Sequence, residues 1–307
     1  MGTPSLSVPF LDSLLKSGRN VGCAVTQSDK PKGRGQKLTP SPVKEFAVLH
    51  GIPVLQPKRL SDPAFADSIK AVEPDYIVVV AYGKIIPLEI LQIPKKCPVN
   101  VHVSLLPEYR GASPIQRAIM DGRRFTGVTT MLMSPELDAG DILLQERIEI
   151  DRSDTAGSLG IKLSETGVDL LIRTLDELDR GEIVPVPQQH DKATYAPLLR
   201  KEDGLIDWQD STENIYNRIR AFNPWPGAFT FYKGKRWGIW KAEVVEKRFQ
   251  SSAPGELVEV GPSGIVVSTG DGGLKITEMQ AEGKRRMGVG EYLRGQKAEK
   301  GVIFRRS

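Results

Sequence analysis

The feature that most constrains the fold is a short, continuously apolar run, Ile77 to Val80, inside the segment 76–81. A strand that is apolar toward both faces is typical of a parallel sheet with helices packed on each side. Four further strand-like runs occur, at 21–26, 99–104, 127–133 and 142–150. Helical patterns lie around them, at 8–17, 41–50, 62–72, 113–121 and 154–179. This alternation predicts a parallel α/β sheet with right-handed crossovers over the first two thirds of the chain.

The alternation of strand and helix patterns ends near Val184, where prolines and a polar run follow. A short helix is expected at 212–221, and glycine-punctuated apolar runs follow at 228–232, 237–245, 255–260, 264–269 and 274–279. Short strands at this spacing are typical of a small β-barrel or sandwich. We therefore expect an N-terminal domain over residues 1–187, a linker over 188–207 and a C-terminal domain over 208–307.

Composition excludes several classes of protein. With 307 residues, 39% hydrophobic and 26% charged, the chain has the make-up of an ordinary globular protein of two domains. No apolar run approaches the roughly 20 residues that a membrane helix needs, and the first residues lack the features of a secretory signal. The only two cysteines, Cys23 and Cys97, favour buried thiols in a reducing compartment over a metal site. We expect a cytoplasmic monomer with no membrane partner.

Charge is distributed unevenly along the chain. Residues 1–207 hold 25 Lys and Arg against 27 Asp and Glu, a net of −2, whereas residues 208–307 hold 17 against 11, a net of +6. The first part suits an enzyme that handles small molecules, and the second suits contact with a polyanion. A solvated basic surface without a partner is an equal alternative on charge alone.

The segment Val99 to Ser104 carries the strongest chemical signal. In a strand, side chains alternate between faces, so Asn100, His102 and Ser104 share one face and three valines share the other. A lone histidine in such a strand is more often a hydrogen-bonded core residue, but three polar side chains on one face near a strand's carboxyl end favour a ligand site. Histidine moves protons near neutral pH and an asparagine amide stabilises a developing oxyanion. The pair suits acyl-type transfer, and the lack of a nearby nucleophile favours direct attack by the substrate.

A third polar candidate lies in the turn Glu136 to Asp141, which precedes the strand at 142–150. Asp138 and Asp141 are both possible partners for the histidine, and spacing does not choose between them. A turn aspartate that binds its own backbone is an equal alternative. Neither a nucleotide loop nor a metal centre is expected: 33–38 lacks the third glycine of a dinucleotide fingerprint, and the three histidines are scattered.

The motif Asn100-x-His102-x-Ser104-Leu105-Leu106-Pro107, followed by the run 109–116, resembles the signature of folate-dependent formyltransferases. In that family the asparagine and histidine act with the aspartate of a Leu-Asp-x-Gly turn, which 137–140 matches, so the resemblance selects Asp138. It also implies that Ser104, Leu105, Leu106 and Pro107 line the folate site, largely through main-chain groups. The implied donor is 10-formyltetrahydrofolate, converted to tetrahydrofolate, with no metal or nucleotide cofactor.

Other matches are narrower. The runs 1–4, 26–31, 33–35, 40–44 and 221–227 are similar to the members whose acceptor is methionine carried by initiator tRNA. This resemblance implies a Rossmann-like catalytic domain followed by an OB-like barrel, with initiator methionyl-tRNA as partner. The methionine amine would attack the formyl carbon while Asn100 and protonated His102 stabilise the oxyanion and Asp138 orients the ring. The rivals are a formyltransferase acting on glycinamide ribonucleotide or an amino-sugar nucleotide, and a nucleic-acid-binding relative that has lost catalysis.

Two expectations concern the N-terminal part of the chain. Lys32, Arg34 and Lys37 lie among prolines and glycines that forbid a regular helix, so we expect an exposed loop that contacts tRNA phosphates; a solvated loop is the alternative. The resemblance also implies a short apolar strand before Met1. Without it, the sheet lacks an expected central strand and its neighbours keep unpaired ladder groups.

Overall fold

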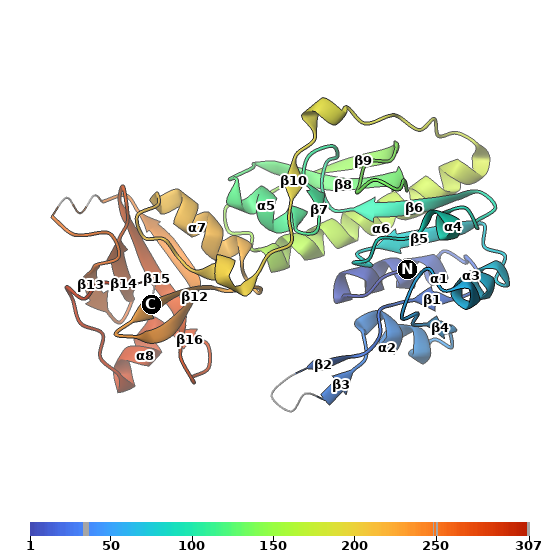
Figure 1. Cartoon of the computed structure of the whole chain (residues 1–307). Helices are drawn as coiled ribbons and strands as arrows, with labels where there is room; N and C mark the ends of the chain where they lie inside the picture. The colour runs from blue at the N-terminus through green and yellow to red at the C-terminus, as the bar shows by residue number, and fades with distance from the viewer. Residues whose placement is uncertain (33–36, 248, 250, 306–307) are drawn as a thin grey trace. The chain divides into compact units, whose positions relative to one another are not determined.

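The computed structural model describes all residues except 33–36, 248, 250 and 306–307 (Figure 1). The chain divides into two compact units. Unit 1 comprises residues 1–114, 125–149 and 160–197, and unit 2 comprises residues 115–124, 150–159 and 198–307. Two short segments that precede residue 160 thus group with the C-terminal part. The simpler division at residues 187 and 207 stays a prediction.

Unit 1 is built on a four-stranded sheet in the order β5-β6-β8-β9 (Figure 1). Its strands are β5 (Tyr76–Val80), β6 (Cys97–His102), β8 (Phe125–Leu132) and β9 (Ile142–Glu149). β5 and β6 are parallel, as expected from the apolar run in β5. β8 is antiparallel to β6, and β9 is antiparallel to β8. The expected parallel sheet is therefore confirmed for β5 and β6, whereas β8 and β9 add antiparallel pairs, so the sheet is mixed.

The length of one connection accounts for the antiparallel pair β8 and β9. β8 and β9 are joined by a loop without a helix, and such a connection suits antiparallel neighbours, because parallel strands need a crossover of a dozen or more residues. The connection from β6 to β8 does contain a helix, α5 (Pro114–Met120). The length of this helix does not fix the direction of β8, since β5 and β6 are parallel although they are joined through α4 (Leu88–Leu91), which has only four residues.

Three short strand pairs complete unit 1. β1 (Ala24–Val25) is parallel to β4 (Val54–Leu55), and β7 (Arg110–Gly111) is parallel to β10 (Tyr195–Ala196). β2 (Lys30–Lys32) forms an antiparallel pair with β3 (Lys37–Thr39). α2 (Pro42–Leu49) contacts both β1 and β4. The pairing of β7 with β10 brings the segment around residue 195 close to the residues that follow β6.

The helices of unit 1 begin where capping residues and prolines predict. α2 (Pro42–Leu49) and α3 (Pro63–Lys70) each have proline at the first position, and Ser41 and Asp62 accept a backbone hydrogen bond as caps. The remaining helices of unit 1 are α1 (Val8–Lys16), α4 (Leu88–Leu91) and most of α6 (Ala156–Arg180), with 3-10 turns η1 (Ser5–Ser7) and η2 (His190–Lys192). All of α5 but its first residue groups with unit 2. None of the described helices is long and apolar enough to span a bilayer.

α6 is the longest helix, and its apolar face is the one expected from leucine spacing. Leu163, Leu170, Leu171 and Leu175 are each at most 2% exposed. Its Thr174 hydroxyl lies 2.8 Å from the hydroxyl of Thr130 in β8, so the helix packs directly on the sheet. The helix is followed by glycine at position 181 with a positive φ, which matches the predicted stop.

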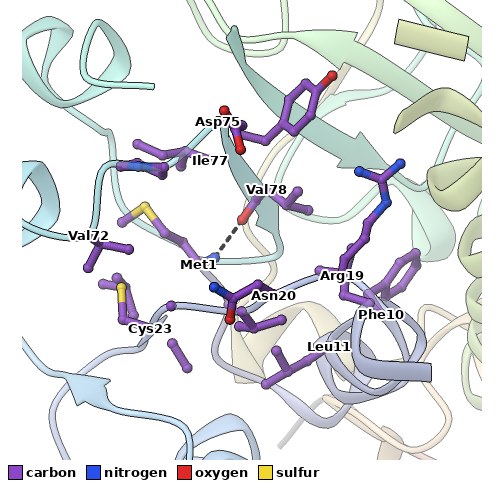
Figure 2. A pocket seen from close by; sticks show the side chains of 18 of the residues that line it. Met1, Phe10, Leu11, Arg19, Asn20, Cys23, Val72, Asp75, Ile77 and Val78 are labelled. Atoms are coloured by element: carbon purple, nitrogen blue, oxygen red, sulfur yellow. Dashed lines mark hydrogen bonds between the residues drawn. The ribbon is translucent and has the colours of Figure 1, made fainter. Parts of the chain in front are cut away.

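The first residues of the chain join β1 to β5. Gly2 donates to Val25 O at 3.0 Å, and Val80 donates to Met1 O at 2.9 Å. Between the two strands lies a cavity of about 360 Å³, into which the Met1 amine projects and donates to Val78 O at 2.5 Å (Figure 2). Burial lowers the pKa of this amine from 8.0 to about 6.

Unit 2 is an antiparallel sheet in the order β11-β12-β15-β14-β13, with β16 added to β15. Two helices accompany it, α7 and α8, and the core contains Trp237, Ile239 and Ile276 packed with Ile215 and Ile219 of α7. The bounds are α7 (Thr212–Ala221), β11 (Ala228–Tyr232), β12 (Lys235–Val245), β13 (Leu257–Gly261), β14 (Gly264–Ser268), β15 (Gly273–Ala281), β16 (Met287–Gly288) and α8 (Val289–Gly295), preceded by the 3-10 turn η3 (Lys201–Gly204). The predicted all-β C-terminal part is confirmed.

Candidate active site

β6 carries Asn100 and His102 on one face, as the sequence pattern requires. Asn100 lies opposite Val79 of β5 and Met131 of β8, and His102 lies opposite Thr129 of β8. Both side chains are buried, with 8% and 6% of the residue exposed. The strand therefore holds two polar side chains in a low-exposure setting, where hydrogen bonds and charges act more strongly than in water.

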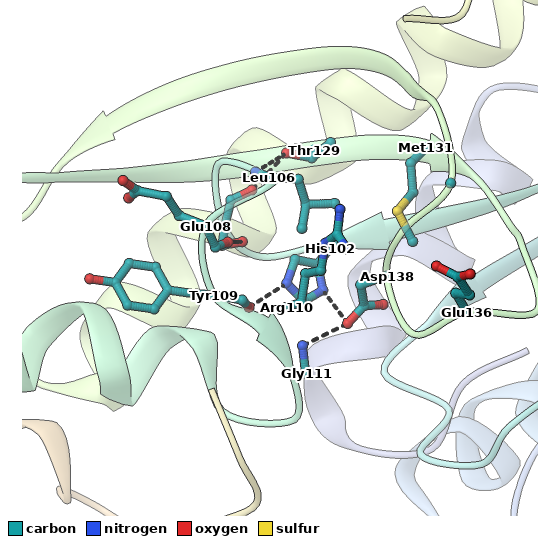
Figure 3. Close-up of polar contacts among 12 residues, drawn as sticks. His102, Leu106, Glu108, Tyr109, Arg110, Gly111, Thr129, Met131, Glu136 and Asp138 are labelled. Atoms are coloured by element: carbon teal, nitrogen blue, oxygen red, sulfur yellow. Dashed lines mark hydrogen bonds and ion pairs between the residues drawn. The ribbon is translucent and has the colours of Figure 1, made fainter. Parts of the chain in front are cut away.

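His102 contacts an acceptor through each ring nitrogen (Figure 3). Its Nε2 lies 3.0 Å from the carbonyl oxygen of Tyr109, and its Nδ1 lies 3.6 Å from Oδ2 of Asp138. The first distance is a hydrogen bond, and the second is an electrostatic contact that is too long for one. The two contacts, one at each ring nitrogen, hold the imidazole in a fixed orientation.

Asp138 is positioned by the turn between β8 and β9. Its backbone has φ of +49°, a left-handed conformation that few non-glycine residues adopt, and its Oδ2 accepts the Gly111 N–H at 2.8 Å. The same oxygen therefore faces both the ring of His102 and a backbone donor. Of the two aspartates that spacing left open, Asp138 lies against the histidine. Gly140 lets this turn pack on β8, since a Cβ there would lie 1.9 Å from Leu132 O.

The amide of Asn100 is the one group of the three without a recorded side-chain hydrogen bond among the described residues. A buried amide normally has a partner in the protein or in solvent. Since Asn100 shares the face of His102, its N–H groups are available to a bound molecule. This is the property expected of a donor to a transient oxyanion.

The segment Ser104 to Pro107 is tightly bound to the protein itself. The Ser104 hydroxyl donates to Glu108 O at 2.6 Å, and Thr129 Oγ1 donates to Ser104 O at 2.7 Å. The Leu106 N–H donates to Thr129 Oγ1 at 3.2 Å, and Leu106 O accepts from Gln145 Nε2 at 2.9 Å. The peptide bond between Leu106 and Pro107 is cis. Several main-chain groups expected to serve folate are thus already used, and the role of this segment stays a prediction.

Two buried residues near the site were missed by sequence reasoning. Gln188, 5% exposed, donates to the backbone of the Asp138 turn, and Arg110, 3% exposed, donates to Gln188. Gln188 lies in a polar run read as a linker, and no pattern in the sequence separates it from its exposed neighbour Gln189. Arg110 lies in the run 109–116, which carries part of the family resemblance, and that is the signal that could have found it.

The basic loop is only partly described. Lys32 ends β2 and Lys37 begins β3, and these two strands pair antiparallel, while residues 33–36 lie outside the described part of the chain. Lys37 is exposed, and Arg34 and the side chain of Lys32 lie outside the described residues. Their contact with tRNA stays a prediction.

The two cysteines are half-buried rather than buried, and partial burial raises the pKa of both thiols. Within the described part of the chain, no cluster of three His, Cys, Asp or Glu side chains is arranged to hold a metal ion. Neither feature adds to the site.

The fold and the site together agree with comparisons to known proteins. Residues 1–175 match the family described as formyl transferase, and residues 198–297 match the formyl transferase C-terminal domain. The chain therefore belongs to the formyl transferase family, a family of enzymes.

Its relatives within the family include proteins named methionyl-tRNA formyltransferase. A methionyl-tRNA formyltransferase of Alkaliphilus oremlandii is 48% identical over 304 residues, 99% of this chain and 98% of the relative. One of Caldicellulosiruptor saccharolyticus is 49% identical over 307 residues, again 99% and 98%. An N-formyltransferase from Helicobacter canadensis, solved with folinic acid and dTDP-3-aminofucose, shares the fold with a TM-score of 0.66 at 19% identity, over 90% of this chain and 96% of that one.

Proposed function

We propose that the protein transfers the formyl group of 10-formyltetrahydrofolate to the amino group of methionine on initiator tRNA. The observation that carries this proposal is the cluster of Asn100, His102 and Asp138 in a chain 48% identical to a methionyl-tRNA formyltransferase over nearly its whole length. The residues supply a donor, a proton carrier and an orienting carboxylate, which are the groups that amide formation by direct attack requires.

The reaction follows from the positions of these groups. The methionine nitrogen attacks the formyl carbon, and the carbonyl oxygen becomes an oxyanion that accepts from the free amide of Asn100. His102 adds a second donor when its bond to Tyr109 O is exchanged for one to the oxyanion. The bond from carbon to N10 of the folate then breaks, and a proton from the attacking amine reaches N10 through the imidazole or a water. Asp138 keeps the ring oriented and stabilises its charged form.

The tRNA is bound through charge in this proposal. Lys32, Arg34 and Lys37 contact phosphates, and the excess of six positive charges over residues 208–307 adds longer-range attraction.

We infer that the C-terminal sheet closes in the manner of an OB-like barrel. In support, Ile303 bridges to Glu256 beside β13 while Arg305 bridges to Phe231 of β11, at the other edge of the sheet.

Glycinamide ribonucleotide and amino-sugar nucleotides are the rival acceptors. The catalytic cluster does not exclude them, and a solved relative of the same fold carries dTDP-3-aminofucose. The basic loop and the basic C-terminal part favour tRNA, since a small acceptor has no need of them. A relative that binds nucleic acid without catalysis is disfavoured by the intact cluster.

The test is a comparison of acceptors with the same donor. Purified protein is given 10-formyltetrahydrofolate with charged initiator tRNA, with glycinamide ribonucleotide, or with an amino-sugar nucleotide, and formyl transfer is followed over time. The proposal predicts rapid transfer to the charged tRNA and little to the small acceptors. Faster transfer to either small acceptor would overturn the assignment of tRNA, and no transfer to any acceptor would overturn the assignment of catalysis.

A further inference from the structure

The Asp138 turn is held by a side chain that lies 50 positions further along the chain. We propose that Gln188, itself fixed by Arg110, is a positioning residue that keeps the carboxylate of Asp138 against His102. This inference rests on the proposed function, because it concerns the geometry of the same cluster. It assigns a catalytic supporting role to a residue in the segment that the sequence presents as a linker.

The amide of Gln188 uses its full hydrogen-bonding capacity. Its Nε2 donates to Asp138 O at 2.9 Å and to Gly140 O at 2.7 Å. Its Oε1 accepts from Arg110 Nε at 3.1 Å and from Arg110 Nη2 at 2.6 Å. An amide has two N–H donors and two acceptor positions on its oxygen, so every group is occupied. A buried side chain with all its hydrogen bonds formed has one orientation. In this orientation Gln188 holds the carbonyl oxygens of Asp138 and Gly140.

Arg110 gives the amide its orientation. Its side chain is buried, and its recorded partners among the described residues are Gln188 and the ring of His190, whose Nδ1 lies 3.4 Å from Nη2. Neither partner is a carboxylate. Burying a charged guanidinium without an opposite charge is unfavourable, so folding stability alone gives no reason for an arginine here. Arg110, however, donates two parallel hydrogen bonds to the amide oxygen of Gln188. These bonds turn the oxygen toward the arginine, so that Nε2 faces the Asp138 turn.

The backbone around Arg110 contacts both members of the proposed catalytic pair. Tyr109 O accepts from His102, and Gly111 N–H donates to Asp138, with positive φ at both residues. Gly111 also packs against Ala196 of β10, where a Cβ would lie 2.7 Å from the carbonyl oxygen. A closed ring of contacts therefore runs from His102 through residues 109–111 and Gln188 to Asp138.

This ring explains how Asp138 keeps an unfavourable backbone conformation. A non-glycine residue at φ of +49° is retained only where its surroundings restrain it. The two hydrogen bonds from Gln188 Nε2 act on the carbonyl of Asp138 itself and on that of Gly140. Without them, we expect the turn to relax and Oδ2 to leave the 3.6 Å contact with His102 Nδ1.

The test uses Gln188→Ala, Gln188→Glu and a double variant with Asp138→Asn. The glutamate has the shape of glutamine and gains an ion pair with Arg110, but it places acceptors against two carbonyl oxygens. Gln189→Ala is the matched control, because it removes an exposed glutamine from the adjacent position. For each protein, kcat and KM for charged initiator tRNA are measured with saturating formyl donor, together with Tm.

We expect kcat to fall at least about tenfold in both Gln188 variants, since displacement of a catalytic group by about 1 Å costs up to ~100-fold. KM for tRNA should change less than twofold, and Gln189→Ala should match the wild type. The glutamate variant separates geometry from folding: its kcat should fall even though its Tm is at least that of the alanine variant. In the Asp138→Asn background, Gln188→Ala should add less than a further twofold loss, because its effect passes through Asp138.

Two results would overturn the inference. One is wild-type kcat in a folded Gln188→Glu protein. The other is a full tenfold loss on Gln188→Ala in the Asp138→Asn background, which indicates a general structural role. Failure of the proposed function looks different, because the wild type itself would then transfer no formyl group to charged tRNA, or Asp138→Asn would retain normal kcat.

Discussion

The buried amine of Met1 leads to a prediction about pH and stability. In a chain whose first residue is Met1, the folded state lowers the pKa of the amine from 8.0 to about 6. Above pH 8 the amine is neutral in both states and has no effect. As the pH falls from 8 to 6, the unfolded chain takes up the proton and the folded one does not, so stability falls. Below about pH 6 both states are charged and the loss stays constant.

The size of the loss follows from the shift. Two pKa units correspond to about 3 kcal/mol, a large part of the roughly 5–15 kcal/mol by which domains are stable. Acetylating the amine removes the charge and should remove this loss. An apolar strand of five or six residues added before Met1 removes the charge too, and it also fills the cavity of about 360 Å³ between β1 and β5.

The assay is urea unfolding at pH 6 and at pH 8.5 for three proteins: the free amine, the acetylated form and the extended form. Acetylation should raise stability by up to about 3 kcal/mol at pH 6 and leave it unchanged at pH 8.5. The apolar extension should raise stability at both pH values, and a polar extension of equal length should behave as acetylation does. Equal pH dependence in the free and acetylated proteins would refute the reasoning, because the remaining titrating groups are common to both.

Two further predictions concern the core and the tRNA. Leu163→Ala should lower the free energy of unfolding by about 2–5 kcal/mol, because the side chain is fully buried, whereas Ile161→Ala on the exposed face of α6 should change it by less than about 0.5 kcal/mol; similar losses in chemical denaturation would contradict the packing of α6. Arg34→Ala should weaken binding of charged tRNA and leave folate binding intact. The slope of log K against log salt concentration should become shallower by about one unit. Superimposable salt curves and equal activity would show that Arg34 lies on solvated surface and does not contact tRNA.

Local sequence signals predicted much of the fold. The bounds of α7 and β11 agree with those expected, because a serine cap and alternating apolar residues define them. The leucine face of α6 is likewise buried as expected. The direction of β8 was not predicted, because strand direction depends on where a connection leads and not on the residues of the strand.

The site was predictable only in part. Strand periodicity put Asn100 and His102 on one face, and that is a local property. Choosing Asp138 over Asp141 needed either a known family or the three-dimensional turn, since both residues lie in the same run. Gln188 could not be identified from the sequence, because its role depends on hydrogen bonds with the Asp138 turn and with Arg110, which lie 50 and 78 positions away along the chain.

The central claim is that His102 takes part directly in formyl transfer. The measurement that tests it most directly is single-turnover transfer from 10-formyltetrahydrofolate to charged initiator tRNA by wild type and by His102→Ala, with circular dichroism to establish folding. The account predicts a rate at least roughly 100-fold lower in a folded variant, the lower range for a positioned acid or base. A near-normal rate in folded His102→Ala protein would contradict it.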